Sequence, residues 1–151
     1  MNYIEAPQEF ASFSIPSVFL AGTITGSSDW QAELCQRIKD INVTVFNPRR
    51  KNFPMSDPKA AEAQITWEYN YLRKATFISF WFAKETIGPI VLFELGAHSM
   101  TTKPLIVGMD PEYPRRQDVE IQMKLIRPEL KIVYSLDDVA TQIQYQTNFY
   151  S

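Results

Sequence analysis

Two glutamates stand where amphipathic helices are expected to carry apolar side chains. The predicted helix from Pro58 has a face formed by Ala61, Ile65, Glu68 and Leu72, and that from Pro89 has one formed by Ile90, Glu94, Ala97 and Thr101. Because an unpaired ionised carboxylate is costly to bury, each group is expected to be paired, neutralised or used in chemistry. Two carboxylates in one cavity suit the cleavage of glycosidic bonds. The alternative interpretation is that each glutamate is solvated.

Other kinds of chemistry are limited by the single cysteine and the single histidine. Cys35 alone cannot form an internal disulfide or a cysteine zinc site, and His98 alone cannot build a histidine metal cluster. His98 lies one helical turn after Glu94 and is interpreted as a packing residue. We therefore expect no metal and no cofactor, and a chemistry that uses carboxylates, hydroxyls and backbone groups.

Charge and hydropathy limit the partners. A net charge of −2 provides no basic surface for a nucleic acid polymer. No stretch approaches the roughly 18 apolar residues of a membrane span, and the N-terminus lacks the basic segment of a signal peptide. We expect a cytoplasmic protein that binds small molecules and neither membrane nor nucleic acid. The 151 residues fit one domain, assigned to residues 17–151 after an N-terminal extension over residues 1–16.

Short apolar runs alternate with helical patterns along the chain. Strands are predicted at Ser17–Gly22, Asn42–Phe46, Thr76–Phe82, Leu105–Gly108 and Lys131–Tyr134. Helices are predicted to begin near Ser28, Pro58, Pro89, Arg116 and Leu136. This alternation favours an α/β fold whose parallel sheet is covered on both faces. We predict a five-stranded, flavodoxin-like sheet in three α/β/α layers.

Ligands of open parallel sheets bind beyond the carboxyl ends of the strands. The residues predicted to lie there are Gly22-Thr23-Ile24, Asn47-Pro48-Arg49-Arg50, Lys84-Glu85-Thr86 and Met109-Asp110. The first of these segments lacks the glycine spacing of phosphate loops and dinucleotide folds, so ATP and NAD sites are not expected. Arg49 and Arg50 are interpreted either as phosphate ligands or as a solvated pair. Trp30 is either a gate over a pocket or a core residue of the first helical turn.

Several short motifs together resemble a known family. The matching segments are Val18–Ile24, Asp29-Trp30-Gln31, Phe46–Arg50, Gln64–Glu68, Phe80-Trp81-Phe82 with Glu85-Thr86, Pro89-Ile90 with Phe93–Gly96, and Tyr113–Arg116 with Asp118-Val119. Each is weak alone, but their order and spacing resemble the nucleoside 2-deoxyribosyltransferase-like family over about residues 17–122.

The resemblance implies roles for particular residues. The nucleophile of the family is the glutamate of an E-L-G motif, here Glu94, and Glu68 takes the place of a second acid that is an aspartate in well-known members. Glu85 is the nearest match to a third acid, which contacts the base. Together with the positions after the strands, the motifs give as candidate substrate-binding residues Gly22, Thr23, Ile24, Asp29, Trp30, Asn47, Arg49 and Glu85. The family also implies nucleosides and nucleobases as ligands and a homo-oligomer, as a dimer or larger.

The implied activity is the exchange of the base of a 2′-deoxynucleoside through a covalent deoxyribosyl-Glu94 intermediate, with retained configuration. Two alternatives stay open. One is an N-glycoside hydrolase of deoxynucleosides or their 5′-monophosphates, and the other is a nucleotide-sensing domain without turnover.

Overall fold

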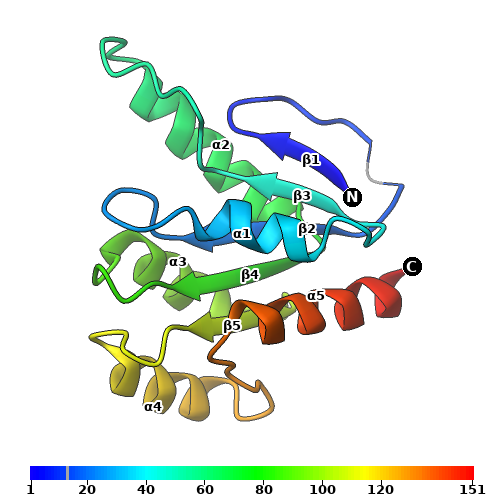
Figure 1. Ribbon diagram of the computed structural model, residues 1–151, viewed down its shortest axis with the longest axis vertical. Coiled ribbons are helices and arrows are strands. Elements are labelled where there is room, and N and C mark those ends of the chain that lie inside the picture. Colours follow the sequence, from blue (N-terminus) through cyan, green and yellow to red (C-terminus); the bar gives the residue numbers. More distant parts are fainter. Residues whose placement is uncertain (13) are drawn as a thin grey trace.

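A five-stranded parallel sheet forms the centre of the protein (Figure 1). The structure is a computed structural model and describes residues 1–12 and 14–151. The strands are β1 (Asn2–Glu5), β2 (Ser17–Gly22), β3 (Thr44–Asn47), β4 (Phe77–Phe82) and β5 (Leu105–Met109), in the spatial order β1-β3-β2-β4-β5. The predicted α/β class with a parallel sheet in three layers is confirmed. From β3 to β5, the order β3-β2-β4-β5 follows the flavodoxin-like pattern.

Five helices cover both faces of this sheet (Figure 1). They are α1 (Trp30–Arg37), α2 (Ala60–Lys74), α3 (Pro89–Ser99), α4 (Arg116–Ile126) and α5 (Leu136–Tyr150). Apolar residues of α1 and α5 pack on one face, and those of α2, α3 and α4 pack on the other. On this second face, β2 therefore lies beneath two helices, α2 and α3.

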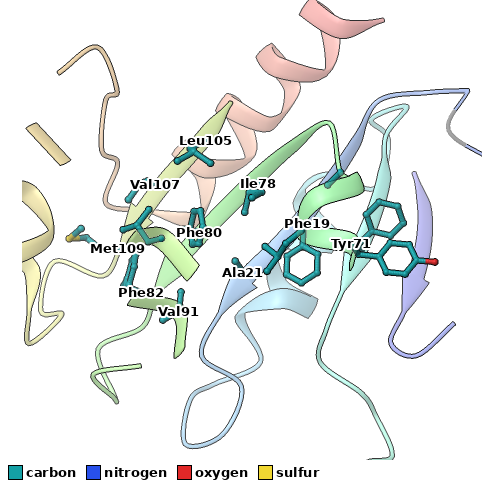
Figure 2. Close-up of a cluster of buried hydrophobic side chains, with 14 of the residues drawn as sticks. Phe19, Ala21, Tyr71, Ile78, Phe80, Phe82, Val91, Leu105, Val107 and Met109 are labelled. Atoms are coloured by element: carbon teal, nitrogen blue, oxygen red, sulfur yellow. The ribbon is translucent and has the colours of Figure 1, made fainter. Parts of the chain in front are cut away.

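Alternation along the strands builds the two cores. Phe19 and Ala21 of β2 point to the same face as Ile78 and Phe80 of β4, and Tyr71 of α2 packs there (Figure 2). The intervening residues Val18, Leu20, Phe77 and Trp81 belong to the other core. Because successive side chains of a strand point to opposite faces, one short apolar run supplies both cores.

The structure differs from the predicted strands at two places. The first strand, β1, lies inside the segment treated as an extension, and it pairs in parallel with β3 at the edge of the sheet. Its side chains are exposed or half-buried, so the segment carries little hydrophobic pattern. The predicted strand at Lys131–Tyr134 is reduced to one bridge between Gly108 and Val133. The chain leaves the sheet directly afterwards, because Ser135 caps the N-terminus of α5 by accepting a hydrogen bond from the Asp138 amide at 3.1 Å.

The loops at the carboxyl ends of β2 and β4 meet one another. Gly88 precedes α3 with φ of +64°, in the left-handed region that favours glycine. A Cβ at Gly88 would lie 2.5 Å from Oγ1 of Thr23 and 2.6 Å from Cγ1 of Val91. Glycine therefore lets the start of α3 approach the loop after β2, which brings these two segments to the same edge of the sheet.

The packing of β5 leads to a stability prediction. An alanine Cβ at Gly108 would lie 2.5 Å from Cγ2 of Val139 and 2.9 Å from Cε3 of Trp81. We expect Gly108→Ala to lower the free energy of unfolding by roughly 1–3 kcal/mol, because a packed core does not accept the added methyl group. Chemical denaturation monitored by circular dichroism measures this change.

Gly96→Ala is the matched control. A Cβ there meets no atom within 4 Å in the described part of the chain, and the residue lies inside α3. Alanine should raise the free energy of unfolding by roughly 0.5–1 kcal/mol through helix propensity. Equal stability of the two variants would contradict the proposed packing.

Candidate active site

A cleft of about 780 Å³ lies between α2 and α3, above β2. Its floor is formed by Phe19 and Ala21, and its upper end by Gly22, Thr23 and Ile24. The remaining lining comes from the loop after β3, from α2, and from the segment that begins at Thr86 and runs into α3. The cleft therefore extends to the carboxyl ends of the strands, where parallel sheets bind ligands.

Glu68 and Glu94 face this one cleft from its two helical walls. The residues that share their helix faces also line it, namely Ala61, Ile65 and Leu72 on α2 and Ile90 and Ala97 on α3. These faces were predicted to point into the core, and that prediction is wrong except for Leu72, which is 3% exposed and belongs to both the core and the cleft lining. Ile65 and Ile90 are each 65% exposed, and the core-facing residues of the two helices are Trp67, Tyr71, Val91 and Leu95. The two helix faces, each of which carries one carboxylate, form the walls of the cleft.

The electrostatics of the pair follow from burial and proximity. Burial, and then the neighbouring Glu68 carboxylate, raise the pKa of Glu94 to about 8. Burial also raises the pKa of Glu68, while a hydrogen bond from Gln64 opposes that rise. Two interacting carboxyl groups with raised pKa values titrate as a pair and hold a proton near neutral pH. Carboxyl pairs of this kind serve as acid, base or nucleophile in glycosidic chemistry.

Gln64 is a cleft residue whose role was not predicted. Its Nε2 donates to the carbonyl oxygen of Pro48 and to Oε1 of Glu68, both at 2.7 Å. The signal in the sequence was its position one helical turn before Glu68, where side chains of a helix are neighbours.

The loop after β2 brings three predicted residues to the cleft, and other predicted residues hold that loop. Gly22, Thr23 and Ile24 line the cleft. The indole Nε1 of Trp30 donates to the carbonyl oxygen of Thr23 at 3.0 Å, and the ring is buried, with 1% of its surface exposed. Of the two interpretations of Trp30, the core residue is the one found, and Trp30 does not gate the cleft.

Arg49 is the main support of the same loop. Its guanidinium donates to the carbonyl oxygens of Ile24, Ser27 and Ser28 at 2.7–3.0 Å, and to Oε1 of Gln31 at 2.9 Å. These four bonds use both terminal nitrogens of the guanidinium, Nη1 and Nη2, within the protein. They disfavour the interpretation of Arg49 as a phosphate ligand.

Asp29 and Asn47 also act beside the cleft and do not line it. Asp29 caps α1 by accepting from the amide of Ala32 at 3.1 Å, and it forms an ion pair with Arg49 at 3.6 Å. Asn47 donates to the hydroxyl of Tyr3 at 2.9 Å and accepts from the amide of Arg49 at 2.9 Å. Together with Arg49 and Trp30, these residues fix the loop that carries Gly22, Thr23 and Ile24.

Glu85 is exposed and does not line the cleft, whereas its neighbour Thr86 does. The structure thus brings Glu68 and Glu94 together and leaves the third predicted acid outside.

The lower end of the cleft carries residues that the sequence analysis did not select as ligand contacts. Tyr69, Arg73 and His98 line it, and the Arg73 guanidinium lies over the Tyr69 ring at 3.5 Å from the centroid. His98 is only 6% exposed, and burial, then the charges of Arg73 and Lys103, lower its pKa. Its imidazole is therefore neutral at pH 7. His98 packs as predicted, but it packs as part of the cleft wall.

Within residues 1–12 and 14–151, no group of three or more His, Cys, Asp or Glu side chains is arranged to hold a metal ion. No helix in these residues has the length and apolar character that crossing a membrane requires.

Known proteins resemble the chain in fold and in sequence. Among solved structures, a 2-deoxyribosyltransferase from the psychrotolerant bacterium Bacillus psychrosaccharolyticus matches with a TM-score of 0.61 at 16% identity, over 82% of this chain and 90% of that one. A conserved protein from Enterococcus faecalis V583 matches with a TM-score of 0.61 at 13% identity, over 88% of this chain and 99% of that one. At these identities the likeness shows the shared fold. The search of curated proteins finds no match.

The family comparison extends over well over half of the chain. Residues 15–113, which include β2, both cleft helices and the two glutamates, match the family described as nucleoside 2-deoxyribosyltransferase like. The resemblance inferred from the motifs is thereby confirmed, and the protein belongs to the nucleoside 2-deoxyribosyltransferase-like family.

Proposed function

We propose that the protein is a nucleoside 2-deoxyribosyltransferase that exchanges the base of a 2′-deoxynucleoside through a covalent deoxyribosyl-Glu94 intermediate, with retained configuration. The observation that carries this proposal is that Glu68 and Glu94 face one cleft from opposite walls, with the pKa of both raised. Family membership gives the substrate class, nucleosides and free nucleobases, that such a pair would act on.

The cleft offers separate surfaces for the parts of a nucleoside. Ile24, Phe53 and Ile90 provide apolar surface near the loops, which suits a flat base. The sugar then lies between Glu68 and Glu94. Gly22 and Thr23 supply backbone and hydroxyl groups at the same end of the cleft. Asp29, Trp30, Asn47 and Arg49 contribute through the loop that they hold and not by contact.

The chemical step uses the two carboxyl groups. A carboxylate oxygen of Glu94 forms a bond to the anomeric carbon as the bond to the base nitrogen breaks, and the electron pair stays with the base. The leaving base takes a proton from the carboxyl pair. Because Glu85 lies outside the cleft, Glu68 is the acid assigned to that transfer. A second base attacks the same carbon in the reverse sense and returns a proton to the pair.

Hydrolysis is the second candidate function. The position of Trp30 supports it, because this side chain does not shield the cleft from water. With Trp30 in the core, no indole covers the cleft, while Phe93 on the cleft wall is 75% exposed. Water that enters in place of a second base would release free deoxyribose. A 5′-monophosphate substrate would find Arg73 lining the cleft, whereas Arg49 is engaged and Arg116 pairs with Glu120 at 2.7 Å.

Exposed apolar side chains on the cleft walls support the proposed homo-oligomer. Ile65, Ile90 and Phe93 are each at least 65% exposed and lie close to the opening. We expect sedimentation velocity to give a mass of two or more chains, and Phe93→Glu to shift it toward a single chain. A monomer at all concentrations would contradict this expectation.

Base exchange and its dependence on Glu94 test the proposed activity. Deoxyinosine or deoxycytidine mixed with adenine should yield deoxyadenosine, followed by chromatography. Glu94→Gln should reduce the rate on the order of 10³-fold or more, because it removes the attacking oxygen.

Glu62→Gln is the matched control for this variant. Glu62 is exposed on the first turn of α2, so the activity of Glu62→Gln should equal that of the unaltered protein. Free deoxyribose without deoxyadenosine would favour the hydrolase. Ligand binding without turnover, unaffected in Glu94→Ala, would favour the sensing domain.

The protonation of Glu94 predicts how stability depends on pH. The pKa in the folded protein, about 8, is above the ordinary value of 4.5, so the protonated form stabilises the fold. This stability is complete below pH 4.5 and is lost as the pH rises through 8. The free energy of unfolding should fall by roughly 2–4 kcal/mol over this range relative to Glu94→Gln. Denaturant titrations across the range measure the difference, and parallel curves for the two proteins would refute it.

A further inference from the structure

Gln64 links the loop after β3 to the carboxylate of Glu68. Its Nε2 donates at 2.7 Å both to the carbonyl oxygen of Pro48 and to Oε1 of Glu68. Pro48 is buried, and Gln64 itself lies on the wall of the cleft. Its Oε1 is buried and has no hydrogen-bond partner within residues 1–12 and 14–151.

The carbonyl oxygen of Pro48 decides the orientation of the Gln64 amide. A carbonyl oxygen only accepts hydrogen bonds, so the NH₂ group of Gln64 must face it. The exchanged orientation would place two acceptors, the Gln64 and Pro48 oxygens, against each other. With the orientation set, the second N–H of Nε2 is directed at Glu68, and Oε1 of Glu68 must be the acceptor. A proton on the Glu68 carboxyl group is then carried by Oε2.

We propose that Gln64 is a positioning residue: anchored on the Pro48 carbonyl, it holds Oε1 of Glu68 as an acceptor and makes Oε2 the oxygen that passes the proton between Glu94 and the base. This role rests on the function proposed above. Gln64 thereby determines which oxygen of Glu68 is free to exchange a proton.

The Gln64 amide makes two hydrogen bonds at the cost of one unpaired acceptor. A buried acceptor without a partner is unfavourable, and Oε1 of Gln64 is such an acceptor among the described residues. An apolar side chain of the same length would avoid this cost, but it would remove the donor from both the Pro48 carbonyl oxygen and Oε1 of Glu68. The amide nitrogen therefore serves the loop after β3 and the ionised form of Glu68 together.

The proton balance of the reaction agrees with this assignment. In the empty cleft the hydrogen bond from Gln64 favours ionised Glu68, and the pKa of Glu94 is about 8, so the shared proton lies on Glu94. Glu94 passes this proton to Oε2 of Glu68 and forms the bond to the anomeric carbon. The breaking bond leaves its electron pair on the base nitrogen, and Glu68 gives the proton to the base. The two side chains carry one negative charge before and after the step.

Other titratable groups that line the cleft with Glu68 must be considered in any pH experiment. They are Tyr69 and Arg73 on α2, and Glu94 and His98 on α3. His98 is neutral at pH 7, since burial and the nearby Arg73 and Lys103 lower its pKa. The cleft residues on β2 and in the described loops are uncharged.

Gln64→Met tests the proposal, because methionine keeps the length of the side chain and removes both donors. The carboxyl carbons of Glu68 and Glu94 are titrated by NMR in the ligand-free protein with ¹³C-labelled glutamate. We expect the lower of the two apparent pKa values of the pair to rise in Gln64→Met. The acidic limb of kcat/KM should move to higher pH by the same amount, and kcat should fall about tenfold with little change in KM.

Two further variants keep the test decisive. Gln144→Met replaces an exposed glutamine on α5 and should change neither the titration nor the rate profile. Gln64→Asn retains an amide but is too short to bridge both acceptors, so we expect the same changes in titration and rate as for Gln64→Met. This variant takes the place of Gln64→Met if the methionine variant folds poorly. An unchanged titration of both carboxyl groups in the Gln64 variants would overturn the proposal. A changed titration in a protein without turnover would instead overturn the proposed function and would support only the hydrogen bond by which Gln64 favours ionised Glu68.

Discussion

The burial of two carboxyl groups that face one cleft is the constraint on which the site depends. Glu68 and Glu94 cannot both ionise there at low cost, because each is partly removed from water and the charge of Glu68 further disfavours ionised Glu94. The pair therefore keeps a proton at a pH where isolated glutamates have none. In the proposed reaction this proton would go to the leaving base.

The fold satisfies this constraint by distributing the work over several elements. The two carboxyl groups come from separate helices, α2 and α3, which share one face of the sheet and form the two walls of the cleft. Backbone contacts place the loops around them. Arg49 holds three carbonyl oxygens of the loop after β2, and Gly88 lets the start of α3 approach Thr23. Residues such as Arg49, which does not line the cleft, thus hold the loops at its border.

Much of the sequence analysis survives because it used local rules. The strands at β2, β4 and β5 follow from short apolar runs, and Glu68 and Glu94 were selected because carboxylates interrupt an apolar face. The edge strand β1 was not predicted by such rules, since it pairs with β3 through the backbone and its side chains are exposed or half-buried. The strand predicted at Lys131–Tyr134 is wrong for the opposite reason. An apolar pattern is present there, but only Val133 pairs with the sheet.

By itself the sequence determined the α/β class, the parallel sheet, the family and the two glutamates, because periodicity and motif order are properties of neighbouring residues. Only the tertiary structure decided that the faces of Glu68 and Glu94 form a cleft wall, that Arg49 and Trp30 support a loop, that Glu85 stays outside, and that Gln64 bridges Pro48 and Glu68. These relations join residues from separate elements. Their distances depend on how helices pack against a twisted sheet, and no local pattern along the chain encodes that packing.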